Sequence, residues 1–309
     1  MNKTTKGLLL VSATTIISGI AIFINSLFIH QINPTAYTFA KNGIVTVILF
    51  LLIVSITQFR KQSNDPICIR NLNKKQWLKL FTVGVIGGGI PFILFFEGLA
   101  LSTGPSGAFI HKSMFVFIAI IAFFHLKEKI SPVIIPAGLI ILFGNFLLLK
   151  TELISFNIGN ILVLCATLFW AVENILAKKY LQEIHPIPLA FGRMAFGLVI
   201  LMGYLLATGN LIELQNFTIY SFAWAIITAG MLLGYMLTWY YGLRLIPVSL
   251  AATVLLIASP ITYILNLIFT QTPVSALQGI GIVMIISGVG IWGYVSAKKM
   301  EKRELNQAT

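Results

Sequence analysis

A histidine and a lysine, His111 and Lys112, stand next to each other inside a long apolar stretch of the sequence. From Gly104 to Phe124 all other residues are apolar or small apart from two serines, and a charged run at 127–129 closes the stretch. About 20 such residues cross a bilayer, and Lys112 would lie about 12 Å along the helix, near the middle of the hydrocarbon layer. An ammonium group there costs roughly 2.5–3.5 kcal/mol unless something stabilises it. Lys112 is therefore either a structural residue, paired with a carboxylate or snorkelling, or a charge in a substrate pathway, and its depth favours the pathway.

Two more charged residues are expected at a similar depth, in the outer half of the protein. Lys41 follows Pro34 by seven residues and Glu97 precedes Ser102 by five, so each lies roughly 7–10 Å from the outer end of its predicted span. Glu97 could pair with one of the lysines as a structural ion pair. One carboxylate cannot neutralise two lysines, and the remaining positive charge suits a substrate carboxylate or another anionic group. The predicted outer substrate-binding residues are Lys112, His111, Lys41 and Glu97.

Another pair of opposite charges, Glu173 and Arg193, is predicted in the inner half. Glu173 comes five residues before Lys178, and Arg193 follows Pro186 by seven. Because these charges balance, the pair could equally form an inner gate, a structural ion pair or a substrate contact. Near the inner end of the eighth predicted span, the aromatic run 239–241 is either an interfacial belt or a wall for an apolar or aromatic substrate. On the second interpretation Tyr241 joins the substrate-binding residues.

Some of these side chains could also carry a coupling proton. A carboxyl or imidazole group that moves between wet and dry surroundings changes its proton affinity, which makes Glu97 and His111 candidates. The sequence contains no HExxH, CxxC or GxxxxGK[ST] motif. We therefore predict no catalytic residue, no metal site and no cofactor.

Composition places the chain in a membrane. It has 309 residues, of which 58% are hydrophobic and 10% charged, with a mean hydropathy of +0.93, and no soluble globular protein has these values. A formal net charge of +12 could indicate nucleic-acid binding. However, 17 of the 21 lysines and arginines lie at the amino end, in alternate connections or after Ser296, which is the positive-inside pattern. It predicts no nucleic-acid partner, cytoplasmic termini and an even number of spans.

Ten apolar runs, bounded by polar residues, glycine or proline, predict ten transmembrane helices. Spans of a β-barrel would instead alternate between polar and apolar residues over about 10 positions. The connections are too short to hold a catalytic domain outside the membrane. The runs are about 7–29, 35–57, 77–99, 104–124, 133–149, 159–177, 187–208, 221–242, 247–269 and 277–296.

The second half of the sequence repeats the first. The offset between equivalent residues shrinks from 152 to 143 along the chain, as small loop deletions would cause. Five spans per copy is an odd number, so the copies must be inverted, as in secondary transporters whose sites lie between the repeats. The predicted units are 1–152, 153–297 and a charged cytoplasmic tail at 298–309. Equivalent pairs include Gly7 and Gly159, Lys41 and Arg193, Gly98 and Gly242, and Ser106 and Ser249.

These features resemble the EamA-type branch of the drug/metabolite transporter superfamily. The resemblance rests on Ser18-Gly19 and Trp170-Ala171 in the first helix of each copy, a basic residue after proline in the second, a Gly-Leu step before the fourth, and Glu128 followed by Gly138. It covers about 7–296 and implies a ten-helix transporter of small metabolites, often amino acids and frequently exported. The chain departs from the family where Gln271 replaces the counterpart of Glu128, and in its His111-Lys112 pair.

We therefore predict an all-α integral membrane protein with two inverted five-helix repeats. It would be a secondary transporter rather than an enzyme, and would export small polar, carboxylate-bearing metabolites such as amino acids by alternating access. One alternative is transport of phosphorylated or nucleotide-linked sugars, which is disfavoured because only three basic residues lie within spans, at different depths. A membrane enzyme or signalling protein is the alternative from another class. The expected surroundings are the lipid bilayer of a prokaryotic inner membrane, and a homodimer is compatible with this prediction.

Overall fold

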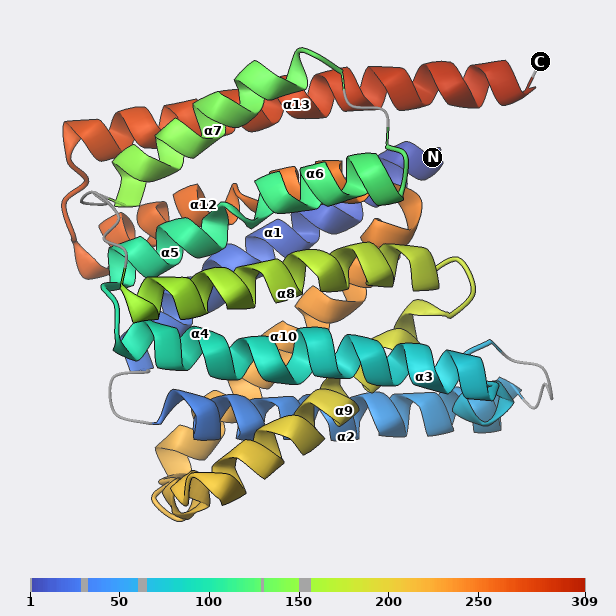
Figure 1. The fold of residues 1–309 in the computed structure, drawn as a ribbon, viewed down its shortest axis with the longest axis vertical. Helices are drawn as coiled ribbons and strands as arrows, with labels where there is room; N and C mark the ends of the chain where they lie inside the picture. Colours follow the sequence, from blue (N-terminus) through green and yellow to red (C-terminus); the bar gives the residue numbers. More distant parts are fainter. Residues whose placement is uncertain (1, 29–32, 61–65, 129–130, 150–156, 309) are drawn as a thin grey trace.

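The computed structural model describes residues 2–28, 33–60, 66–128, 131–149 and 157–308, without the side chains of Phe28, Arg60 and 301–308. All regular structure in these ranges is helical, and most helices lie side by side across the molecule (Figure 1). The helical elements are α1 (Lys3–Phe28), α2 (Pro34–Arg60), η2 (Ile69–Asn71), α3 (Lys74–Val83), η3 (Gly84–Gly89), α4 (Ile90–Ala100), α5 (Gly104–Lys112), α6 (Met114–His125), α7 (Ile134–Leu149), α8 (Ile158–Tyr180), α9 (Pro186–Ala207), η4 (Asn210–Leu214), α10 (Ile219–Leu245), α11 (Val248–Leu255), α12 (Ala258–Leu265), η5 (Asn266–Thr270) and α13 (Ala276–Ala308).

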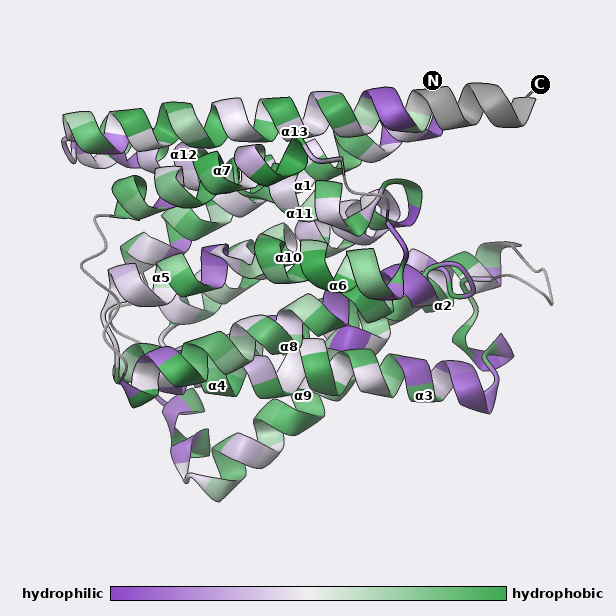
Figure 2. Cartoon of the chain, turned by 45° about the horizontal axis from the view of Figure 1, so that its top comes forward, coloured by the Kyte–Doolittle hydropathy of each residue, from purple (hydrophilic) through white to green (hydrophobic). Residues whose placement is uncertain are grey.

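Nine helical stretches in the described ranges are long and apolar enough to cross a membrane. A tenth, α7, has 16 residues and is about 24 Å long. Hydrophilic residues gather at helix ends, most clearly at the start of α3 (Figure 2). These features confirm the all-α integral membrane fold. The residues at 298–308 of the predicted charged tail continue α13, because nothing between Ser296 and Ala308 breaks the helix.

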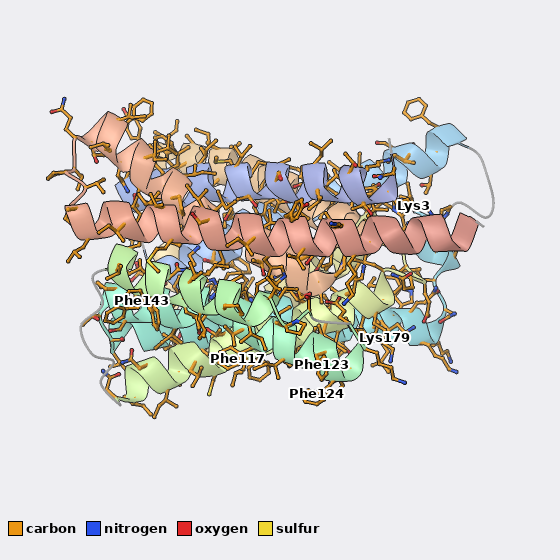
Figure 3. The ribbon with its side chains drawn as sticks, turned by 90° about the horizontal axis from the view of Figure 1, so that it is seen from above. Lys3, Phe117, Phe123, Phe124, Phe143 and Lys179 are labelled. Carbon is orange, nitrogen blue, oxygen red and sulfur yellow. The ribbon has the colours of Figure 1, made fainter. Side chains whose placement is uncertain are left out.

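Both termini lie at one end of the bundle. The start of α1 and the end of α13 are adjacent in Figure 1, and Lys3 and Lys179 mark the same end in Figure 3. We call this the basic end. An even number of crossings returns the chain to the side where it began, in agreement with the ten predicted spans.

Local capping explains where several helices begin. Asn73 and Gln76 form a reciprocal capping box at the start of α3, and Thr103 accepts a hydrogen bond from the Ser106 N–H at the start of α5. Asn157 caps α8 in the same manner. These side chains satisfy backbone N–H groups that have no partner within the first helical turn, which matters at the edge of a bilayer.

Helices from the two halves of the chain pack on each other. Helix α4 packs along α8, and the equivalent helix α10 packs along α1. The second helices, α2 and α9, pair with each other, and so do the fifth helices, α7 and α13 (Figure 1). Helices α1 and α8 run in opposite directions. Any site in the middle of the bundle is therefore built from both halves.

Glycines that are equivalent in the repeat make two close backbone contacts between these helices. A Cβ atom added at Gly98 would lie 2.8 Å from the Gly159 carbonyl oxygen, and one at Gly242 would lie 3.3 Å from the Gly7 carbonyl oxygen. The first contact joins the end of α4 to the start of α8. The second joins the end of α10 to the start of α1, at the opposite end of the bundle (Figure 1). Small residues allow this backbone approach, as in other membrane helix pairs.

Three of the spans are interrupted near their middle. The fourth span breaks between α5 and α6 at Ser113, directly after Lys112, and the ninth breaks between α11 and α12 around Ile257. These breaks are at nearly equivalent positions of the two copies. The third span passes through the π-helical segment η3, which contains the triple glycine 87–89. Short π-helical segments occur frequently at functional sites.

Candidate functional site

The backbone carbonyl of Gly87 is the centre of a buried polar cluster. Pro91, four residues later, has no N–H to donate to this carbonyl. Two side chains donate to it instead: Trp170 Nε1 at 3.0 Å and Arg193 Nη2 at 3.2 Å. A Cβ atom on Gly87 would lie 2.3 Å from Glu173 Cγ. Glycine is therefore required here so that side chains from α8 and α9 can reach η3.

Glu173 and Arg193 lie together in this cluster, as the sequence predicted, but each is incompletely satisfied. Glu173 is 0% exposed and accepts a hydrogen bond of 2.7 Å from the Tyr240 hydroxyl. Its Oε1 atom is 4.0 Å from Arg193 Nε, too far for a hydrogen bond. Arg193 Nη1 contacts Met236 Sδ at 3.4 Å. Glu173 Oε2 and Arg193 Nε are buried and have no hydrogen-bond partner in the described part of the chain.

His111 extends the cluster towards the opposite end of the bundle. Its ring is 4.9 Å from the Trp170 ring and 5.2 Å from the Phe95 ring, measured between centroids. Its Nδ1 atom is buried and lacks a hydrogen-bond partner among the residues that the structure describes. The contacts from His111 through Trp170 and the Gly87 carbonyl to Arg193 are continuous. Histidine, arginine and glutamate thus share one aromatic-lined region near mid-span.

The two lysines predicted to bind substrate are partly buried within their spans. Lys112 is the last residue of α5, and its ammonium group has no hydrogen-bond or ion-pair partner within the described ranges. Lys41 Nζ lies 5.7 Å from the centroid of the Tyr37 ring, and the Tyr37 hydroxyl in turn bonds the Thr228 hydroxyl on α10 at 2.7 Å. Neither lysine has a carboxylate partner within that part of the chain.

Glu97 lies away from this region and does not pair with either lysine in the described structure. It is exposed near the end of α4 and accepts a hydrogen bond from the Tyr204 hydroxyl on α9. Successive helical residues are about 100° apart, so Glu97 points roughly 200° away from Phe95, which faces His111. Of the two alternatives that the sequence left open, the structural Glu97–lysine pair does not form within the described residues, where Glu97 bonds Tyr204 instead.

Tyr241 is also outside the cluster. Its hydroxyl lies 3.4 Å from His185 Nε2, and the two rings meet edge to face at 5.6 Å, where α9 begins. Its neighbours Trp239 and Tyr240 face the cluster instead: Trp239 Nε1 donates to Asn174 Oδ1 at 3.1 Å. The aromatic run thus contributes Trp239 and Tyr240 to the buried region, whereas Tyr241 contacts His185 at the start of α9.

Sequence reasoning did not identify several members of the cluster. The spacing of Gly87 and Pro91 predicts a freed carbonyl, which was a usable signal. No sequence pattern predicts the contacts of Phe95 and Tyr240, because these contacts depend on the rotation of α4 and α10 about their axes relative to α8. The members not predicted as site residues are Gly87, Phe95, Trp170, Asn174, Met236, Trp239 and Tyr240.

A second group of charges ties the helices together at the basic end. Glu128 accepts hydrogen bonds from the Val248 N–H at 2.8 Å and the Ser249 N–H at 3.3 Å, at the start of α11. Lys178 Nζ donates to the carbonyls of Leu243 at 2.7 Å and Ile246 at 2.8 Å, at the end of α10. An anion at a helix start and a cation at a helix end both interact favourably with the helix dipole. Together they fix the connection between α10 and α11.

Comparison with known proteins assigns the chain to a family. The sequence profile of the EamA-like transporter family matches residues 5–150 and again 157–293. An uncharacterized transporter of Bacillus subtilis, YyaM, is 23% identical over 289 residues, covering 88% of this chain and 90% of the relative. An uncharacterized transporter of Methanothermobacter thermautotrophicus is 23% identical over 303 residues, covering 92% and 85%.

A solved structure has the same fold. It is titled only as the crystal structure of a protein, and it superposes with a TM-score of 0.74 at 15% identity, covering 95% of this chain and 99% of that one. Because the family profile matches both halves of the chain, the chain belongs to the EamA-like transporter family, within the drug/metabolite transporter superfamily.

Proposed function

We propose that this transporter exports small carboxylate-bearing metabolites, such as amino acids, through the cluster around Glu173 and Arg193. The observation that carries the proposal is the set of buried polar atoms without partners: Glu173 Oε2, Arg193 Nε and His111 Nδ1. A buried polar atom left unpaired costs about 1–3 kcal/mol, and more if charged. A ligand that supplies both an acceptor and a donor would recover this energy. An amino acid has both, since its carboxylate suits Arg193 and its ammonium group suits Glu173.

The aromatic side chains around these charges favour a substrate with an apolar part. Trp170 has Phe92 at 5.2 Å and Phe95 at 5.4 Å between ring centroids. Lys112 and Lys41 add two positive charges within the spans, while the described spans carry few carboxylates. An overall positive pathway attracts a carboxylate in preference to a cation. The proposed substrates are therefore anionic or zwitterionic, and His111 or Glu97 is the proposed carrier of a coupling proton.

Alternating access is the proposed mechanism, because the cluster is built by both halves of the repeat. It combines the Gly87 carbonyl of η3 and side chains of α4 and α5 in the first half with side chains of α8, α9 and α10 in the second. Rocking one half against the other would expose the same residues first to one side and then to the other. The distribution of basic residues supports a cytoplasmic location for both termini, in a prokaryotic inner membrane.

Flux measurements test the proposal. Purified protein in proteoliposomes should transport at least one amino acid or related carboxylate from a metabolite panel, and an inward or outward pH gradient should change the rate if a proton is coupled. Protein-free vesicles provide the background. A folded, reconstituted protein that moves no carboxylate in the panel would contradict the substrate class.

Labelling tests alternating access separately. Cysteines introduced as Lys41→Cys and Arg193→Cys occupy equivalent positions of the two copies, each seven residues after the proline that begins its helix. They should react with a membrane-impermeant maleimide from the outside and inside respectively. Labelling of both from one side would exclude the mechanism.

A further inference from the structure

The face formed by α6, α7 and α13 contains an apolar groove that the transport cluster does not use. Its volume is about 500 Å³, within the range of small-molecule sites. The lining is aliphatic and aromatic apart from Ser131. It includes Phe123 from α6, Leu139 from α7 and Trp292 from α13. Figure 3 shows Phe123 and Phe124 projecting outward on this side of the bundle.

The groove exists because α6 and α7 pack against different partners. Helix α7 lies along α13, with Gly144 and Gly281 in backbone contact, whereas α6 packs on α8 and α11. Phe115 and Trp292 meet edge to face with centroids 6.0 Å apart and close the floor. Gly138 keeps the wall open, since a Cβ atom there would only touch Trp292 at 3.4 Å and Phe115 at 3.8 Å. The space between α6 and α7 is therefore a consequence of tight packing elsewhere.

The end of the groove near Ser131 and Phe124 reaches the basic end of the protein. His125 and Lys127, both exposed, come one and three residues after Phe124, where α6 ends. Lys127 has a φ of 52°, a left-handed conformation that non-glycine residues rarely adopt. This turn brings Glu128 inward to the start of α11 while Lys127 is exposed. The exposed Lys127 thus lies three residues after Phe124 and four before Ser131, the lining residues at this end of the groove.

We propose that this groove binds one anionic phospholipid, with an acyl chain between α6 and α7 and its phosphate near Lys127. Basic residues beside gaps between transmembrane helices on the cytoplasmic side bind anionic head groups, and each contributes about five-fold to binding. The apolar lining suits a hydrocarbon chain and offers a polar ligand almost nothing to pair with. A neutral lipid would fill the groove equally well but would gain nothing from Lys127.

Native mass spectrometry of the purified full-length protein can test this, using phosphatidylglycerol and phosphatidylcholine with identical acyl chains. The wild-type protein should retain one phosphatidylglycerol per chain at lower lipid concentration than it retains phosphatidylcholine. Lys127→Gln should weaken phosphatidylglycerol binding about five-fold and leave phosphatidylcholine unchanged. Lys75→Gln is the matched control and should have no effect, because Lys75 is exposed at the start of α3, which packs on α9.

Two variants test the groove itself. Gly138→Leu should fill it and reduce retention of both lipids, and Leu139→Trp should do the same from a position that is 62% exposed and outside the core. Equal affinity of the wild-type protein for the two lipids would reduce the site to ordinary bilayer contact and overturn the proposal. Conversion of a dimer to a monomer by either variant, without loss of lipid, would instead assign the groove to a second copy of the chain.

Discussion

Removal of the Glu173 charge separates a substrate site from a purely structural ion pair. In Glu173→Gln, the Arg193 guanidinium keeps its bonds to the Gly87 carbonyl and Met236 sulfur but loses its only nearby carboxylate within the described structure. Removing one partner of a buried ion pair costs about 3–5 kcal/mol. The 4.0 Å separation places this pair at the weak end, so we expect about 3 kcal/mol. The midpoint of thermal unfolding should fall by roughly 5–10 °C.

The double variant Glu173→Gln, Arg193→Met decides between the two roles. It removes both charges, and buried pairs can often be replaced by neutral groups at little cost. We expect its stability to return to within about 1 kcal/mol of the wild-type protein, while flux in proteoliposomes stays at background because the substrate has lost both partners. Flux restored together with stability would refute the substrate role and make the pair part of the scaffold.

An exposed ion pair provides the matched control. Lys79 and Glu183 also join the two halves of the chain, but their side chains are 24% and 56% exposed. Such pairs contribute about 0–1 kcal/mol. Glu183→Gln should therefore change neither the unfolding midpoint nor the flux appreciably. A loss as large as that of Glu173→Gln would mean that charge removal anywhere between the halves is harmful.

Other parts of the structure make further predictions. Glu128→Ala removes the acceptor for two N–H groups at the start of α11 and should lower stability by about 1–3 kcal/mol in thermal unfolding; an unchanged midpoint would show that water replaces it. Gly281→Leu should prevent close packing of α7 on α13 and reduce the monodisperse fraction in size-exclusion chromatography, whereas normal yield would contradict the glycine contact. Lys112→Met should raise the half-saturating concentration of a carboxylate substrate but not of a neutral analogue, and equal effects on both would remove Lys112 from the pathway. A tag at Asn2 should be cytoplasmic and one inserted near Asn210 external, and protease protection of both on the same side would contradict the topology.

The sequence alone determined the fold class and the internal repeat. Continuous apolar runs can form only helices in a bilayer, since every backbone polar group must be satisfied within its own span. The repeat offsets make Gly7 equivalent to Gly159 and Gly98 equivalent to Gly242. All four glycines lie at close helix crossings, Gly98 against Gly159 and Gly242 against Gly7, because such crossings require small residues. The sequence also predicted that Glu173 and Arg193 would lie together. Counting residues places the two side chains at similar depths in neighbouring spans.

Only the tertiary structure decided which side chains meet. Glu97 bonds Tyr204, which is 107 residues away, and Glu128 bonds the start of α11, 120 residues away. Depth in the membrane follows from counting residues, but the neighbour of a side chain also depends on helix rotation, and one residue changes its direction by about 100°. That rotation is set by packing of both faces of each helix against other spans. The sequence could therefore place His111 and Glu97 in the same half of the protein but could not show that His111 contacts Phe95 while Glu97 bonds Tyr204.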